Sequence, residues 1–142
     1  MPRWLFKSEP DCYSLEHLKA EGSTLWDGIS NAQALGFLRQ CKAGDLGFFY
    51  HTGKEKAIVG VLRVTGEAVP DPAGESEKEL VLPVEFAKAL KQPVTLKAIK
   101  ADPAFAEWEL VKNSRLAVMP CPMELWKRVE AYAAGKLPEP AE

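Results

Sequence analysis

Residues 44–66 read GDLGFFYHTGKEKAIVGVLRVTG, and this stretch decides the fold. Its two runs of aromatic and β-branched residues favour β-strands. Between them, Thr52-Gly53-Lys54-Glu55 has the composition of a tight loop. We therefore predict a β-hairpin whose strands cover residues 46–51 and 57–66.

The segment before the hairpin predicts one strand and two short helices. A strand over residues 3–8 stops at Pro10, because the residue that precedes a proline is driven out of the helical region. Ser14 can cap a helix that ends near residue 20, and Asn31 can cap another that ends near residue 41. Trp26-Asp27-Gly28 is interpreted as a turn between them.

After the hairpin, residues 69–78 carry two prolines, a glycine and several acids, which predicts a surface loop. Residues 80–86 favour a strand, and Pro83 within it indicates an edge position, since proline cannot donate to a ladder. The remaining predicted elements are a helical turn from Thr95 to Lys100, another from Pro103 to Trp108, a strand over residues 116–119 and a helix from Pro122 to Ala134.

About five short strands interspersed with short helices do not follow the strict alternation of a doubly wound sheet. We predict an α+β fold in which a strongly curved sheet or partial barrel is surrounded by helices. The 142 residues fit one domain, which we place at residues 1–135, with a flexible tail at 136–142.

Charge and cysteine content narrow the class of protein. The formal charge of −2 argues against a basic coat for nucleic acid, but residues 67–79 carry five acids and one lysine, which leaves +2 for the rest and room for a modest basic face. Cys12, Cys41 and Cys121 have no ligand or disulfide spacing, and the two histidines are too few for most metal sites. We expect no metal and no cofactor.

No apolar signal-peptide core follows the N-terminus, and the longest apolar stretch, residues 57–62, is far below the roughly 20 residues of a membrane helix. Together with unpaired cysteines, this predicts a reduced, cytoplasmic protein that makes no contact with membranes. Motifs for the common hydrolases, nucleotide phosphates and dinucleotides are missing from the sequence.

Aromatic rings or turn residues stand beside polar groups in four segments of the first 51 residues: Trp4-Leu5-Phe6-Lys7-Ser8-Glu9-Pro10, Trp26-Asp27-Gly28, Gly44-Asp45 and Phe48-Phe49-Tyr50-His51. This combination is typical of a pocket for a flat ring whose edge carries heteroatoms. The alternative is that each ring packs in the core and that Gly44-Asp45 is only a turn. For His51, a structural role and a role in the site are equally good interpretations. His17 is interpreted as a solvated helix residue.

In their order, these segments resemble the successive signatures of the EVE domain, and residues 58–61, 69–72 and 115–120 agree with it. The resemblance runs from about residue 3 to residue 134. It implies a PUA-like pseudo-barrel of five to six strands with peripheral helices, related to YTH and ASCH domains.

The resemblance also implies a pocket that receives a modified base. Lys7 and Ser8 would lie at its rim, and Trp26 would provide a stacking face. Asn31, Tyr50 and His51 would make polar contacts. Further candidates for the site are Glu9, Arg115 and Met119.

The sequence departs from the family pattern at three places. Ser30-Asn31-Ala32 replaces a frequent arginine, asparagine and tyrosine, Leu35-Gly36 replaces a polar and often basic pair, and Ala117 stands where serine is common. The lost cations would weaken phosphate contacts, and the lost tyrosine and hydroxyl would change the size or selectivity of the pocket.

Three hypotheses follow. The first is a non-catalytic reader of a modified cytosine or adenine in DNA, or alternatively in RNA, which acts alone or with an effector partner. The second is an ASCH-like amidohydrolase of modified nucleosides, in which Lys7 and Glu9 are the acid and base. The third is a module that binds a small metabolite or a protein. The sequence makes no prediction of the oligomeric state.

Overall fold

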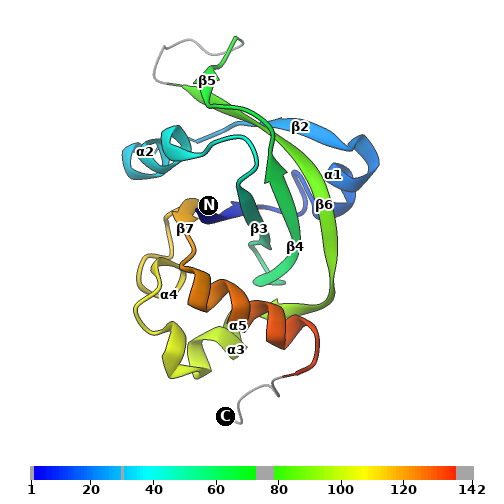
Figure 1. Ribbon diagram of the computed structural model, residues 1–142, viewed down its shortest axis with the longest axis vertical. Coiled ribbons are helices and arrows are strands. Elements are labelled where there is room, and N and C mark those ends of the chain that lie inside the picture. The colour runs from blue at the N-terminus through cyan, green and yellow to red at the C-terminus, as the bar shows by residue number, and fades with distance from the viewer. Residues whose placement is uncertain (1, 30, 73–78, 137–142) are drawn as a thin grey trace.

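The computed structural model describes residues 2–29, 31–72 and 79–136, and these residues form one curled mixed sheet surrounded by helices (Figure 1). The strands are β1 (Arg3–Ser8), β2 (Ser23–Trp26), β3 (Leu46–His51), β4 (Ala57–Val64), β5 (Val69–Pro70), β6 (Leu80–Thr95) and β7 (Val118–Pro120). Their order is β2-β6-β4-β3-β1-β7, with β5 paired to β6. The sheet curls into a half-barrel, as predicted.

The helices among the described residues are α1 (Leu15–Glu21), α2 (Ala32–Gln40), α3 (Leu96–Ala101), a 3-10 turn η1 (Pro103–Phe105), α4 (Glu109–Lys112) and α5 (Met123–Ala133). Three of them, α3, α4 and α5, gather at one end of the sheet, while α2 lies toward the other end and contacts β7 and β6 (Figure 1). The helix α1 packs against β2 and β6.

Strand β3 is the centre of the sheet, because it pairs in parallel with β1 and antiparallel with β4. Both of its faces are covered, which is why residues 46–51 are almost continuously apolar. On one face Phe48 stacks on Trp126 of α5, with ring centroids 3.7 Å apart. On the other, Phe49 meets the edge of Trp26 at 5.3 Å.

Strand β6 spans 16 residues and arches along the whole molecule (Figure 1). Its register with β4 shifts twice, between Ile58 and Gly60 and between Val61 and Leu62. Such irregularities bend a strand and increase its twist, and here they let one strand follow the curl of the half-barrel. The sequence predicted only the first part of β6.

The predicted edge position of Pro83 is wrong, because β6 lies between β2 and β4. The carbonyl of Pro83 accepts from Thr65 N at 2.9 Å, one residue beyond the last residue of β4, Val64. A residue's N–H and C=O point to the same side of a strand. The missing N–H therefore faces a position where the ladder has already ended.

Strands β2 and β5 and helix α4 were not predicted, and only the last residue of β2, Trp26, lies in the predicted turn Trp26-Asp27-Gly28. In β2, Leu25 is 50% exposed while Trp26 is buried, so the four residues contain no apolar run that indicates a strand. The predicted helical turn at residues 103–108 is a 3-10 turn over Pro103–Phe105. Ser30, part of the predicted loop at 69–78 and most of the predicted tail lie outside the described residues.

The predicted helix caps are confirmed. Ser14 Oγ accepts from His17 N at 3.2 Å, and the His17 ring accepts from Ser14 N in return. Asn31 Oδ1 accepts from Ala34 N at 3.0 Å. The side chain of Thr95 caps α3 in the same way, through Ala98 N. Pro122 occupies the position just before α5 instead of its first turn.

Gly44-Asp45 is structural. Asp45 is buried, and its Oδ2 accepts from Trp4 Nε1 and from Lys42 N, both at 3.0 Å. Gly44 has a φ of 95°, a left-handed conformation that suits glycine. The pair therefore joins the turn before β3 to strand β1, which confirms the interpretation as turn chemistry.

All three cysteines are free thiols, and Cys41 and Cys121 are buried. In the part of the chain that the structure describes, no helix is long and apolar enough to cross a membrane. The same residues contain no group of three or more acidic, histidine or cysteine side chains that could hold a metal ion.

We expect two glycine-to-alanine substitutions to change stability in opposite directions. A Cβ on Gly60 would lie 2.6 Å from a Leu15 methyl and 2.9 Å from the Lys88 carbonyl, so Gly60→Ala should lower the free energy of unfolding by about 1–3 kcal/mol. Gly36 lies inside α2 with open space around it, so Gly36→Ala should raise it by about 0.5–1 kcal/mol. Urea unfolding measures both, and equal effects would contradict the packing at Gly60.

Candidate functional site

A pocket of about 590 Å³ opens where the end of β1 faces β2. Its lining combines carboxylates, hydroxyls and apolar groups from four segments of the chain. The residues are Lys7, Ser8, Glu9, Cys12, Tyr13, Thr24, Leu25, Trp26, Asp27, Gly28, Ile29 and Ala117. We call this the base pocket, because the resemblance to the EVE domain implies a pocket that receives a base.

Trp26 is both a wall of the base pocket and part of the core. It is 6% exposed, and its ring meets Phe6 at 5.5 Å, Phe49 at 5.3 Å and Tyr13 at 6.4 Å, in each case edge to face. These contacts hold the indole in one orientation, so the wall is formed before any ligand arrives.

Ser8 closes the loop that follows β1. Its hydroxyl donates to the Tyr13 carbonyl at 2.5 Å, while its lone pairs stay available to a donor from outside. Tyr13 in turn donates its hydroxyl to Glu21, and burial together with this hydrogen bond raises the pKa of Tyr13 to about 12. The loop between β1 and α1 is therefore held as one wall of the base pocket.

Two carboxylates give the base pocket its polarity. Asp27 makes no hydrogen bond or ion pair with another described residue, so its oxygens are free to accept. Glu9 accepts weakly from Cys12 Sγ at 3.7 Å, and its charge is the main cause that raises the pKa of Cys12. Ser8 adds the lone pairs of a hydroxyl whose hydrogen is already donated to Tyr13, so this side of the pocket offers mainly acceptors.

The ammonium group of Lys7 faces a second hollow. Its Nζ donates to the Ser114 carbonyl at 2.9 Å and lies 5.8 Å from the centre of the Tyr50 ring. Both partners line a neighbouring pocket of about 210 Å³. Burial lowers the pKa of Lys7. Lys7 thus lines both pockets, but its charged ammonium group lies in the smaller one.

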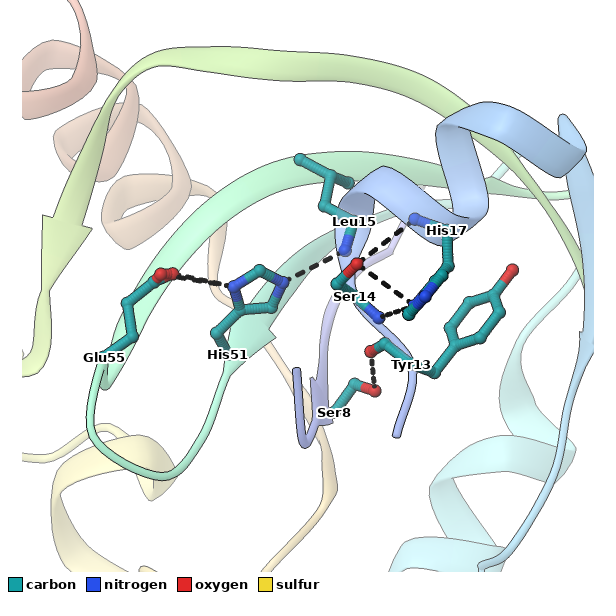
Figure 2. Close-up of polar contacts among 7 residues, drawn as sticks. All are labelled: Ser8, Tyr13, Ser14, Leu15, His17, His51 and Glu55. Atoms are coloured by element: carbon teal, nitrogen blue, oxygen red, sulfur yellow. Dashed lines mark hydrogen bonds and ion pairs between the residues drawn. The ribbon is translucent and has the colours of Figure 1, made fainter. Parts of the chain in front are cut away.

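His51 is structural. It is 8% exposed, its Nε2 accepts from Leu15 N at 3.0 Å, and its Nδ1 lies 2.8 Å from Glu55 Oε1 (Figure 2). Because a backbone N–H donates to Nε2, the proton of a neutral ring sits on Nδ1 and points to the carboxylate. Nε2 thus joins β3 to the start of α1, while Nδ1 is bound to Glu55 in the turn between β3 and β4, and His51 does not line the base pocket.

Other predicted site residues are also absent from the base pocket. Asn31 is exposed and caps α2, Tyr50 lies on the opposite face of the sheet beside Lys7, and Met119 is fully buried in the core. Arg115 is exposed outside the lining. Burial raises the pKa of Tyr50 to about 12, so its hydroxyl stays neutral.

Four of the nine predicted residues, Lys7, Ser8, Glu9 and Trp26, therefore line one pocket, whereas Asn31 and His51 are not among its lining residues. Sequence reasoning missed Thr24, Leu25 and Asp27, among others. Asp27 follows Trp26 within a segment that the aromatic pattern had singled out. Had β2 been predicted there, its end would have marked Asp27 as a residue of the site.

The chain is similar to known proteins over most of its length. The EVE domain family model matches residues 2–132. Chicken thymocyte nuclear protein 1 is 35% identical over 123 residues, which are 68% of this chain and 51% of that protein. The chain thus spans about half the length of the curated relatives it matches.

Solved structures agree over nearly the full chain. A crystal structure of a protein from Agrobacterium tumefaciens has a TM-score of 0.90 at 33% identity and covers 100% of this chain and 99% of that one. Human THYN1 protein, solved in complex with 5-methylcytosine-containing DNA, has a TM-score of 0.86 at 30% identity and covers 94% and 98%. With a family match over nearly its whole length, the chain belongs to the EVE domain family.

Proposed function

We propose that this protein binds a modified base in DNA and catalyses no reaction on it. The observation that carries the proposal is the base pocket itself, in which a fixed indole wall stands beside free acceptors and hydroxyls. The complex of human THYN1 with 5-methylcytosine-containing DNA supports it, because that protein shares 30% identity over 94% of this chain.

The lining suits a base that carries an exocyclic amino group. The flat ring would lie against Trp26, with Ile29 and Ala117 as apolar neighbours for a methyl group. Carboxylates accept hydrogen bonds from the amino group of cytosine, and the free Asp27 is placed for this. Cytosine and adenine carry such a group and thymine does not, so the proposal favours a modified cytosine or adenine over thymine.

Leu25 offers a way to stabilise an extruded base. It is an exposed apolar residue on the rim of the base pocket, directly before Trp26. Proteins that remove a base from its stack often insert an apolar side chain between base steps. Leu25 would fill part of the gap that the extruded base leaves.

The amidohydrolase alternative receives little support from the positions of its two candidate groups. Lys7 directs its ammonium group to Ser114 and Tyr50, whereas Glu9 lies beside Cys12 in the base pocket. An acid and a base that act on one ligand must both reach it. Product formed from acylated or methylated nucleosides would contradict the non-catalytic proposal.

A small-metabolite module differs from a DNA reader in its response to salt. Contacts with phosphates release counterions, so the affinity for DNA falls steeply as salt rises, while that for a neutral metabolite does not.

The cytoplasmic location and an effector partner stay predictions. The curated relatives are named thymocyte nuclear protein 1, and this name does not support a cytoplasmic location.

The direct test is fluorescence anisotropy with labelled oligonucleotides that differ at one base. We expect DNA with one 5-methylcytosine or N6-methyladenine to bind about 10-fold more tightly than the unmodified sequence, the effect of about 1.4 kcal/mol. Single-stranded and duplex forms of each are compared. Equal affinity for all modified and unmodified oligonucleotides would contradict the proposal.

Asp27→Asn should reduce selectivity more than affinity. The substitution keeps the shape of the side chain but replaces one acceptor oxygen by a donor, and a good contact to a base edge contributes about 1–3 kcal/mol of discrimination. We therefore expect the ratio of affinities for a 5-methylcytosine and a thymine oligonucleotide to fall by roughly 5-fold or more.

The matched control for this charge change is Asp11→Asn. Asp11 is exposed in the loop between β1 and α1 and does not line the base pocket. Both variants remove one negative charge, so both should gain general affinity for DNA by a similar amount. A selectivity ratio that changes equally in the two variants would exclude a contact between Asp27 and the base.

Trp26→Phe separates the wall from the core. A phenyl ring keeps part of the stacking surface, so we expect modified DNA to bind about 3- to 10-fold more weakly. Complete loss of a stacking partner would cost more, roughly 1–3 kcal/mol. Trp126→Phe is the control, since Trp126 is equally buried but stacks on Phe48 across the sheet. Both should lower the melting temperature. Equal loss of binding in both would show that Trp26 acts only through stability.

A further inference from the structure

The smaller pocket beside the base pocket is lined by three lysines and by no carboxylate. Its lining residues are Lys7, Tyr50, Thr52, Gly53, Lys56, Leu96, Lys100, Leu110, Val111 and Ser114. We call it the lysine pocket. It lies between the turn that joins β3 to β4 and the helices α3 and α4, which Figure 1 shows at the same end of the sheet.

None of the three lysines is neutralised within the described part of the chain. Lys7 has only the Ser114 carbonyl and the Tyr50 ring as partners, and Lys56 and Lys100 form no ion pair with a described residue. Like charges around one pocket repel one another. Lys7 is also partly buried, which disfavours its charged form. An anion in the pocket would relieve both costs.

The backbone of Lys56 adds an independent observation. Lys56 has a φ of 45°, and among the described residues it is the only one other than glycine in the left-handed region. This conformation is unfavourable for a long side chain, and such outliers concentrate at functional positions. The Lys56 carbonyl accepts from Leu96 N at 2.8 Å, which ties the turn to α3, the helix that carries Lys100. The lysine pocket is therefore held by both segments.

The geometry points to a phosphate site: we infer that the lysine pocket binds a phosphodiester of the same DNA strand whose base enters the base pocket. Lys7 lines both pockets, and the segment from Ser114 to Ala117 borders the smaller pocket with its first residue and the larger with its last. About 210 Å³ accommodates a phosphate group with several waters, each of which takes up about 30 Å³ in the liquid. This inference rests on the proposed function, because it assigns the backbone of the same ligand.

The positive surface continues beyond the lysine pocket. An adjoining hollow shares Lys56, Leu96 and Lys100 and adds Lys54, and its one carboxylate, Glu55, is bound to His51. A second phosphate along the strand would meet this hollow. The lysines thus mark a direction for the strand away from the base pocket and not merely a single point.

Another lysine-rich groove, between β6 and α5, serves as a control surface. It is lined by Lys88, Lys91, Lys127 and Lys136, but it also contains Glu130, which lies 3.6 Å from Lys88. It shares no residue with the base pocket or with the lysine pocket. A charge change there alters the net charge equally without touching the proposed path of the strand.

The test is the salt dependence of binding to DNA with one 5-methylcytosine, measured by anisotropy at several salt concentrations. We expect the double variant Lys56→Gln/Lys100→Gln to bind modified and unmodified DNA about 10-fold more weakly at low salt, with an unchanged ratio between them. The slope of log affinity against log salt should become shallower by about 1–2. Lys91→Gln/Lys127→Gln, with the same change in charge, should keep the slope of the unaltered protein.

An unchanged slope in the first double variant would overturn the inference, as would equal slopes in both double variants. A loss of selectivity without a loss of affinity would also overturn it, since phosphate contacts carry no sequence information. Melting temperatures show whether each variant is folded. The four lysines that are changed are all exposed, so we expect both variants to melt like the unaltered protein.

A second arm keeps this inference distinguishable from the proposed function. An abasic oligonucleotide has phosphates but no base at the tested position, and its titration is followed by the NMR amide signals of Thr52 and Gly53. Shifts with the abasic oligonucleotide support the phosphate site even if the protein shows no preference for modified bases. No shift overturns it. Shifts with inorganic phosphate alone, and none with the oligonucleotide, would also overturn it, because the pocket would then bind a free anion.

Discussion

The parallel pairing of β1 with β3 is the constraint on which both pockets depend. The two strands are in register from Arg3–Leu46 to Ser8–His51, so their side chains alternate between the faces of the sheet together. Ser8 therefore ends on the face of Trp26, while Lys7 ends on the opposite face beside Tyr50. The ends of two adjacent side chains thus lie in different pockets, although Lys7 also lines the base pocket.

Local signals explain which elements could be predicted. The caps at Ser14, Asn31 and Thr95 act on an N–H three residues later, so the sequence contains the whole interaction. The sheet order depends instead on partners far apart in the chain. Pro83 illustrates this, because its edge-like character comes from the place where β4 ends and not from the edge of the sheet.

The same distinction applies to the site. Ser8, Glu9 and Trp26 could be found because polar groups at the end of a strand and an aromatic turn were unusual as a set. The contacts of His51 could not be predicted in this way, because its partners are Leu15 N, 36 residues away in the chain, and the carboxylate of Glu55. The face that Lys7 occupies likewise follows from the register with Tyr50, which composition does not reveal.

The two neighbouring pockets differ in charge, since the base pocket contains two carboxylates and the lysine pocket contains three lysines. Glu9 and Asp27 allow the base pocket to accept hydrogen bonds from an amino group, but two carboxylates near a phosphate chain oppose binding. In a protein whose formal charge is −2, no general positive field offsets that cost. This electrostatic cost has to be offset locally. Lys7, Lys56 and Lys100 provide the positive charge, because they line a neighbouring pocket that contains no carboxylate. Selectivity would then come from the base pocket and base-independent affinity from the lysine pocket, so DNA without a suitable base would keep its phosphate contacts and lose only the contribution of the base pocket.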